Sequence, residues 1–249
     1  IVMGTALLIV GKSGEAFGNV MRSVNEMMML ICDWVIRISP IGIWALIASL
    51  MAEFGFGSIR PLLGFMSTVT LGLGIHGLLT LPLLVLFVAR RQVFAFFKAV
   101  SPAIVTAFST ASSAASLPIA LKNLSSAKIS KLVISFVMPL GTTVNMNGTA
   151  LYQAVATVFL AQIYGVELLI GHYLVIIVTA LLAAISAAAI PSAGLITLTM
   201  ILTAVGIPVE GIALILGVDR ILDMMRTVIN VWGNCCVTAI VQRFNPDAS

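Results

Sequence analysis

The chain has 249 residues, of which 60% are hydrophobic and only 9% are charged, and its mean hydropathy is +1.16. Soluble globular domains carry roughly 25% charged residues, so the composition excludes a cytosolic enzyme, a disordered tail and a disulfide-stapled secreted module. The net charge of +4 is explained better by basic loop ends of a polytopic membrane protein than by a nucleic-acid partner.

The start of the chain and its cysteines also fit a polytopic membrane protein. An apolar run opens the chain at Ile1 and is followed by Lys12, an order that we interpret as the end of a membrane helix rather than a signal peptide. Cys32, Cys235 and Cys236 lie in apolar stretches without metal-ligand spacing, and we expect small buried hydrophobic residues. The sequence has no phosphate loop and no haem or zinc ligand set, so we expect neither a cofactor nor an enzyme.

Uncharged stretches predict the membrane helices in chain order. An apolar helix is expected up to Ala52, and residues 61–89 form 29 residues without a formal charge, long enough to span a bilayer with some tilt. Residues 132–166 and 168–209 are uncharged runs of 35 and 42 residues, which is too long for one straight span each.

Two apolar segments are interrupted by polar or Gly/Pro runs. Residues 99–121 contain the run 109–116, rich in serine, and residues 168–209 contain the run 186–194, which includes Pro191. A non-helical tip at membrane depth is tolerated only where it is buried in protein or lines a wet cavity, and such interruptions point to a transporter's binding site. Re-entrant hairpins and pairs of kinked ordinary helices both explain this pattern.

The last apolar segment carries polar residues on one helical face. Asp219, Asp223, Arg226, Asn230 and Asn234 are spaced by three or four residues, which places all five on one side of an α-helix. Ionisable residues are expensive within a membrane and mark functional sites by default, although a salt-bridge network that only fixes packing explains them too. Arg226 suits a carboxylate and Asp223 suits an ammonium, so a ligand with both groups fits this face.

Two further motifs carry candidate ligand groups. The run Asn145-Met-Asn147-Gly-Thr149 lies inside an apolar span and should unwind the helix, freeing backbone carbonyls that coordinate a hard cation. Ser112 and Ser113 form the serine-rich tip within the run 109–116, and at such a tip with a helix N-terminus after it, backbone N–H groups can bind a carboxylate. Polar helix–helix contacts and close packing of small residues are the alternatives.

Three stretches, in this order and spacing, resemble the dicarboxylate/amino acid:cation symporter family of glutamate and aspartate transporters. Residues 109–118 are similar to its serine-rich first hairpin, 139–153 to its broken helix, and 217–234 to its last helix, and the likeness looks closest to bacterial members. The resemblance implies an all-α polytopic membrane protein with two re-entrant helical hairpins and a broken helix, with N-terminal scaffold helices missing. The resemblance also divides the chain into segments. Residues 1–58 would hold the end of a scaffold helix and a scaffold/trimer-interface helix, and residues 60–91 a transmembrane helix that opens the transport domain. The first hairpin would span 92–127, the broken helix 128–166, the second hairpin 168–209, and the last helix with the substrate-binding face 211–244.

The resemblance also implies a function and site residues. The function is elevator-type symport of aspartate or glutamate with cations. The full-length protein would be a homotrimer in a bacterial inner membrane, without a nucleic-acid partner. Sodium ions would be the coupling ions. The implied substrate residues are Ser112, Ser113, Thr149, Asp223, Arg226, Thr227 and Asn230, and the implied sodium ligands are Gly141, Thr143, Asn145, Asn147, Asn230 and Asn234.

The chain departs from the family pattern at two ion positions. The family usually has Asp where Asn147 and Asn234 stand, and a neutral amide is a weaker ligand for a hard cation than a carboxylate. The second tip has Ala189 and Ser192 where family members often have Gly, which should restrict its backbone. We therefore expect a retained substrate site with weakened sodium sites. A proton-coupled or C4-dicarboxylate relative, a transport-impaired binding protein, and a channel or structural bundle are the alternatives, although Asp223 favours an amino acid ligand.

Overall fold

The computed structural model describes residues 6–7, 9–54 and 59–245, and every regular element in these ranges is helical. The expected all-α class is confirmed for the part of the chain described. The residues form two compact units, Ile1–Ser49 and Leu50–Ser249, which are treated separately below.

The first unit consists mainly of one long helix. A short 3-10 turn, η1 (Gly11–Gly14), leads into α2 (Glu15–Phe54), a 40-residue helix whose final turn is counted with the second unit. Exposed apolar side chains follow α2 along its described positions, among them Met27, Trp34 and Trp44. The side chain of Cys32, expected to be buried, lies outside the described residues.

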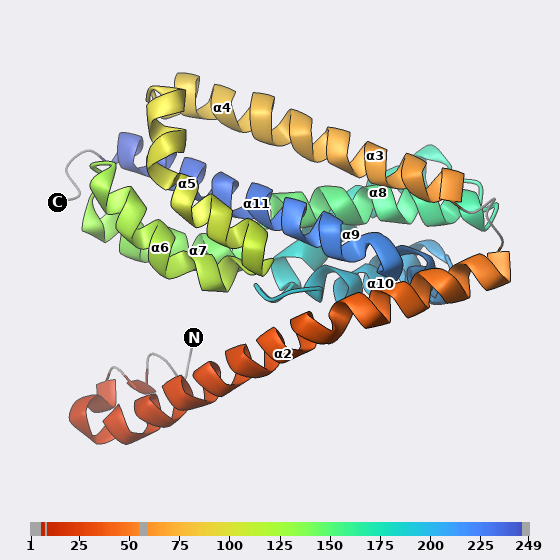
Figure 1. The fold of residues 1–249 in the computed structure, drawn as a ribbon. Helices are drawn as coiled ribbons and strands as arrows, with labels where there is room; N and C mark the ends of the chain where they lie inside the picture. The colour runs from red at the N-terminus through yellow and green to blue at the C-terminus, as the bar shows by residue number, and fades with distance from the viewer. Residues whose placement is uncertain (1–5, 8, 55–58, 246–249) are drawn as a thin grey trace. The chain divides into compact units, whose positions relative to one another are not determined.

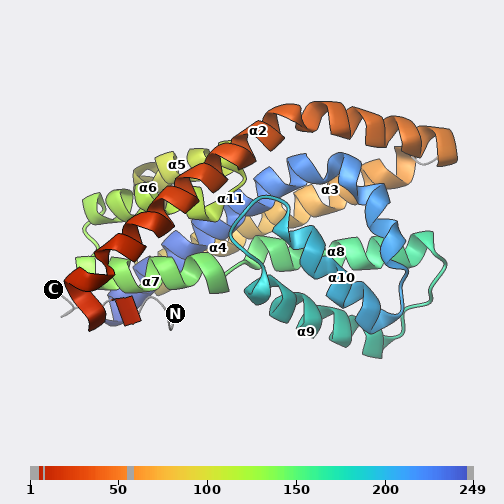
Figure 2. The same ribbon diagram turned by 90° about the horizontal axis from the view of Figure 1, so that it is seen from below.

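The second unit is a bundle around its last helix (Figures 1 and 2). α11 packs against most of the other helices of the unit, so a single long element positions the core. Its residues Cys235 and Cys236 are buried, as expected for small hydrophobic side chains. The helices of the bundle are α3 (Ile59–Ile75), α4 (Leu81–Leu83), α5 (Val93–Thr110), α6 (Ser113–Ser126), α7 (Lys131–Val144), α8 (Asn147–Ile163), α9 (Ile170–Ser186), α10 (Ala193–Val205) and α11 (Ile212–Phe244).

The first helix of the bundle is locally unwound where it meets α11. α3 continues through the π-helical turn η3 (His76–Thr80), α4 and a second π-helical turn, η4 (Leu84–Val88). A Cβ on Gly77 would meet Ile229 Cδ1 at 2.4 Å, so the two helices approach closely there. The Trp232 indole N–H donates to the Gly77 carbonyl at 3.1 Å, which satisfies a group at the π-turn.

Two helix pairs are each joined by a short non-helical tip. α5 and α6 pack together and are joined at Ala111 and Ser112, with Ala111 in the left-handed region at φ 50°. α9 and α10 pack together and are joined by residues 187–192, which end with Ser192 at φ 59°. Neither residue is glycine, and a left-handed conformation costs an L-residue roughly 1–2 kcal/mol.

α7 and α8 are two parts of one interrupted path. Asn145 (φ −97°, ψ 74°) and Met146 (φ −105°, ψ 56°) leave the helical region between them. The interruption falls where the sequence analysis expects the helix to unwind. It leaves the last carbonyls of α7 and the first N–H groups of α8 without intrahelical partners, so both face whatever lies beside them.

The outer surface of the bundle is apolar. Leu78, Ile170 and Leu174 are more than half exposed, and many other large hydrophobic side chains of α3, α5 and α9 are exposed too. Among the described residues, the stretches Arg60–Val88 and Val93–Thr110 are long and apolar enough to cross a membrane. α9 and α10 are apolar but shorter, at 17 and 13 residues.

Candidate functional site

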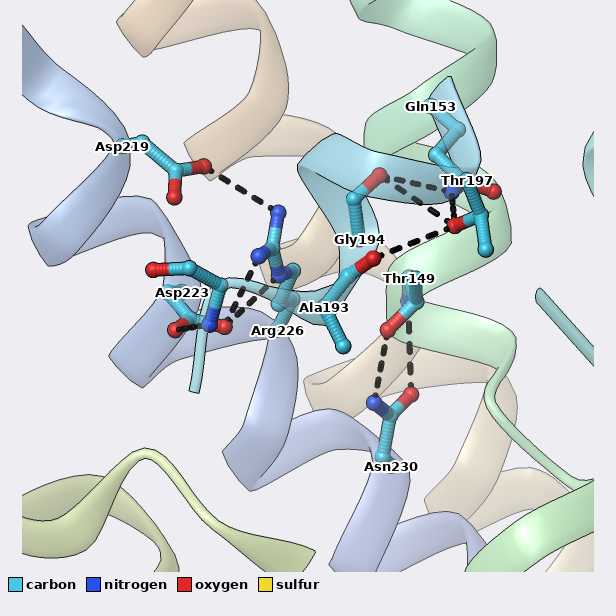
Figure 3. A network of polar contacts seen from close by, with 10 residues as sticks. Thr149, Gln153, Ala193, Gly194, Thr197, Asp219, Asp223, Arg226 and Asn230 are labelled. Carbon is cyan, nitrogen blue, oxygen red and sulfur yellow. Dashed lines mark hydrogen bonds and ion pairs between the residues drawn. The ribbon is translucent and has the colours of Figure 1, made fainter. Parts of the chain in front are cut away.

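The polar face of α11 points into the bundle. Asp219, Asp223, Arg226, Asn230 and Asn234 are each no more than 3% exposed. The predicted gathering of these residues on one helical face is therefore present, and the face is shielded from solvent. Figure 3 shows how the first four lie towards α8 and α10.

Arg226 is held by both aspartates. Its Nε donates to Asp223 Oδ1 at 2.9 Å, and its Nη1 donates to Asp219 Oδ1 at 3.2 Å. Its Nη2 lies 2.9 Å from Asp223 Oδ1 but makes no hydrogen bond of good geometry with the described residues. The guanidinium thus has donor capacity left at the buried Nη2, and its planar fork suits a carboxylate because it can bind two carboxylate oxygens at once.

Two residues of α8 and the start of α10 fix the position of Arg226. The guanidinium carbon lies 4.3 Å from the centroid of the Tyr152 ring, a cation–π arrangement. The Gln153 amide donates to the Gly194 carbonyl at 2.9 Å and to Thr197 Oγ1 at 2.6 Å. A Cβ on Gly194 would lie 3.0 Å from the guanidinium carbon, so this glycine allows the α10 backbone to approach Arg226 (Figure 3).

The two tips meet over this site. The Ser112 hydroxyl donates to the Ala189 carbonyl at 3.0 Å, and Ala114 N–H donates to the same oxygen at 3.3 Å. The N–H of Ser192 donates to Asp223 Oδ2 at 2.8 Å. Backbone groups of the second tip therefore bind the groups that the sequence analysis proposes for a ligand. The Ala189 carbonyl binds the serine tip, and Ser192 N–H binds the Asp223 carboxylate.

The contacts between the tips leave little space in the site. The cavity between the tips, α8 and α11 has a volume of about 20 Å³ and is lined by Ser113, Thr149, Asp223, Arg226 and Thr227, among others. A water molecule needs about 10–15 Å³ by this measure, whereas small-molecule pockets are usually larger than about 300 Å³. The cavity as it stands is therefore too small for a ligand of amino acid size.

Asn230 caps the start of α8 from the neighbouring helix. Its Oδ1 accepts from Gly148 N–H at 2.8 Å and Thr149 N–H at 3.3 Å, and its Nδ2 donates to Thr149 Oγ1 at 2.9 Å. A Cβ on Gly148 would lie 2.5 Å from the Arg226 carbonyl oxygen, so only glycine fits at this crossing. The predicted substrate residues Thr149 and Asn230 are thus joined to each other, one turn from Arg226.

A pair of amides links the end of α7 to α11. Asn145 Nδ2 donates to Asn234 Oδ1 at 2.8 Å, and a Cβ on Gly141 would lie 3.0 Å from the same oxygen. Three of the predicted sodium ligands, Gly141, Asn145 and Asn234, are therefore brought together. The side-chain oxygens of Asn145 and Asn234 are neutral, and that of Asn234 already accepts a hydrogen bond.

Asn147 has a partner that sequence reasoning missed. Its Oδ1 accepts from Gly148 N–H at 2.9 Å, which assigns Nδ2 as the group 3.0 Å from His76 Nε2. Because the amide nitrogen is a donor, the His76 nitrogen accepts, and the imidazole in this contact is neutral. Asn147 and His76 thus form a neutral pair at position 147, where the resemblance implies a carboxylate in most family members. His76 lies at the start of the π-helical turn η3.

The remaining predicted residues differ in their placement. Ser113 and Thr227 are buried and line the cavity, whereas Thr143 is exposed and its hydroxyl donates to Leu140 within α7. Within the described ranges, no three His, Cys, Asp or Glu side chains gather as a metal site. Tyr152 and Gln153 were missed because one apolar ring and one amide in a helix carry no local signal of a partner.

The formal charges of the site set the requirement for a ligand. Asp219 and Asp223 against Arg226 leave one net formal negative charge in a buried place. Burying uncompensated charge is costly, so a cationic group would stabilise this site. With Asn at 147 and 234, two fewer negative charges need compensation than in the usual family pattern.

An apolar helical bundle that buries charged residues beneath two non-helical tips has the construction of a membrane transport protein. The family model for the sodium:dicarboxylate symporter family matches residues 1–244. The chain belongs to this family.

Known relatives agree with the family assignment. Excitatory amino acid transporter 3 of Mus musculus is 39% identical over 98% of this chain, and the match covers 47% of that protein. Excitatory amino acid transporter 2 of Homo sapiens is 42% identical over 97% of this chain, covering 42% of that protein, and excitatory amino acid transporter 1 of Ambystoma tigrinum is 41% identical over 96%, covering 45%. The chain spans about half the length of the curated relatives it matches. These relatives are animal proteins, so the expected closeness to bacterial members stays a prediction.

Proposed function

We propose that the chain forms the substrate-binding part of a secondary active symporter that moves aspartate or glutamate across a membrane together with cations. The observation that carries the proposal is the buried pair of Asp223 and Arg226 beneath two tips that close on them. The pair offers one anionic and one cationic partner, matching the ammonium and the side-chain carboxylate of an acidic amino acid.

In the proposed binding step the ligand replaces contacts that the protein makes with itself. The substrate ammonium takes the place of Ser192 N–H at Asp223, and its side-chain carboxylate binds the open edge of Arg226. The main carboxylate lies against the N-terminus of α6 at Ser112 and Ser113, where backbone N–H groups and the helix dipole favour an anion. Thr149, Thr227 and Asn230 complete the site.

The architecture that we propose follows from helix length. At 1.5 Å per residue, α6, α7 and α10 reach only about 20 Å, which is less than the roughly 30 Å hydrocarbon core. Short paired helices with buried polar tips fit re-entrant hairpins over 92–127 and 168–209. We propose that residues 60–244 move as a transport domain against a trimeric scaffold that includes 1–58, in an elevator mechanism.

Sodium coupling is proposed to be weaker than is usual for the family. The amide pair of Asn145 and Asn234 and the neutral pair of Asn147 and His76 support this, because both ion positions lack a carboxylate. Thr143 would contribute its hydroxyl oxygen to a third ion position, because that oxygen keeps its lone pairs while the hydroxyl donates to the Leu140 carbonyl.

A ligand panel tests this function. The melting temperature of the detergent-purified chain is measured with L-aspartate, L-glutamate, succinate and L-serine, each with and without sodium. Stabilisation by aspartate or glutamate, stronger than by succinate or serine, is expected. Stabilisation by succinate alone would favour the C4-dicarboxylate alternative, and an unchanged melting temperature with every ligand would contradict the proposed binding site.

A further inference from the structure

One end of the second unit gathers basic side chains from four separate elements. They come from the connection between η4 and α5, the first turns of α5, the connection between α6 and α7 with the turns beside it, and the last turn of α11. We call this set the basic end. Its members are Arg90, Arg91, Lys98, Lys122, Lys128, Lys131 and Arg243, all exposed except the half-buried Arg91.

Hydrogen bonds hold these connections side by side. Arg91 Nη1 donates to the Ala127 carbonyl at 2.7 Å, which joins the η4–α5 connection to the α6–α7 connection. The N–H of Ser130 donates to Gln242 Oε1 at 2.7 Å, which joins the latter to the end of α11. Both ribbon views place these three junctions at the same end of the bundle as the C-terminus of α11 (Figures 1 and 2).

The acidic residues of the unit lie elsewhere. Between residues 59 and 245 they are Glu167, Glu210, Asp219 and Asp223, of which the last two belong to the buried site. Glu167 and Glu210 lie in the connections that meet at the start of α11, about 48 Å from Arg243 along a helix of 33 residues. Within the described residues, no member of the basic end forms an ion pair.

Exposed apolar side chains accompany the basic ones. Phe94 is 78% exposed and lies one turn before Lys98, Leu132 is 60% exposed beside Lys131, and Phe244 is 71% exposed. Basic side chains next to exposed aromatic and aliphatic ones are typical of the boundary between headgroups and acyl chains. A solvated end or an acidic soluble partner would account for the charge alone and not for these apolar neighbours.

We propose that the basic end is a binding surface for anionic lipid headgroups. Clusters of four to eight Lys and Arg beside a membrane helix attract anionic lipids, and such lipids are concentrated in the cytoplasmic leaflet. The surface places the connected ends of α5, α6, α7 and α11 next to that leaflet. It is independent of the substrate site, so a chain that failed to bind aspartate would leave this inference intact.

Spin-labelled lipids test the proposal on the full chain in vesicles of phosphatidylcholine and phosphatidylglycerol. The quantity measured is the ratio of labelled phosphatidylglycerol to labelled phosphatidylcholine in the lipid shell around the protein. The test variant combines Lys98→Gln, Lys122→Gln, Lys131→Gln and Arg243→Gln. It spares Arg91, whose hydrogen bonds to backbone carbonyls support the fold.

The matched control keeps the charges and combines Lys98→Arg, Lys122→Arg, Lys131→Arg and Arg243→Lys. We expect the original chain and the control to prefer phosphatidylglycerol several-fold, the Gln variant to lose most of this preference, and high salt to weaken it. An equal preference in the Gln variant would overturn the proposal. So would a chain that shows no preference at all, which would leave an acidic protein partner as the better explanation of the charge.

Discussion

Asp223 and Asp219 form a natural pair for testing the substrate site. Both are buried aspartates of α11 that contact Arg226, but only Asp223 lines the cavity and accepts Ser192 N–H. Asp223→Asn keeps an oxygen acceptor for Arg226 and removes the charge that would bind the substrate ammonium. Losing one partner of a buried charge pair costs roughly 2–5 kcal/mol in binding. Since about 1.4 kcal/mol is tenfold, the Kd for aspartate should rise by roughly 30-fold to several thousandfold.

Asp219→Asn is the matched control, because it neutralises a carboxylate that accepts from Arg226 Nη1 at 3.2 Å but does not line the cavity. Its Kd for aspartate should change far less. The assay is a thermal-shift titration with L-aspartate at saturating sodium, with the melting temperature of each ligand-free variant as the folding control. If Asp223→Asn binds aspartate as tightly as the original chain, or if both variants lose binding equally, the assignment of Asp223 to the ammonium is wrong.

Three further changes follow from the same contacts. Arg226→Cys should lose the preference for acidic over neutral amino acids in a competition assay, because the ligand carboxylate would face no cation; unchanged selectivity would remove that role. The double variant with Asn147→Asp and Asn234→Asp should make aspartate binding more dependent on sodium, measured as a steeper dependence of Kd on sodium concentration. Gly148→Ala should lower the melting temperature by several degrees, because its Cβ would meet a backbone oxygen at 2.5 Å and overpacking costs about 1–3 kcal/mol. Gly171→Ala, with no neighbour within 4 Å, is the control and should change it little.

Local periodicity made the polar face of α11 predictable. Residues spaced by three or four along one helix share a face whatever surrounds it, and the cost of burying charge in an apolar chain indicates that this face is enclosed. The break between α7 and α8 was also predictable from local sequence. Asn and Gly close together disfavour a helix through their own backbone preferences.

Long-range contacts were not predictable from spacing. The pairing of Asn147 with His76 joins residues 71 positions apart and depends on a π-turn in an apolar helix that has no sequence marker. The bond from Ser112 to Ala189 joins residues 77 positions apart and closes the site. A hydropathy pattern is the same for a hairpin and for two kinked helices, so the meeting of the tips emerges only from the packed bundle.

The measurement that tests the central claim most directly is the Kd of L-aspartate for the purified chain as a function of sodium concentration. The account predicts specific binding of the acidic amino acid whose Kd depends only weakly on sodium, because Asn147 and Asn234 supply no charge to an ion. Binding that vanishes without sodium would contradict the weakened ion sites. No binding of aspartate at any sodium concentration would contradict the assignment of Asp223 and Arg226 to an acidic amino acid.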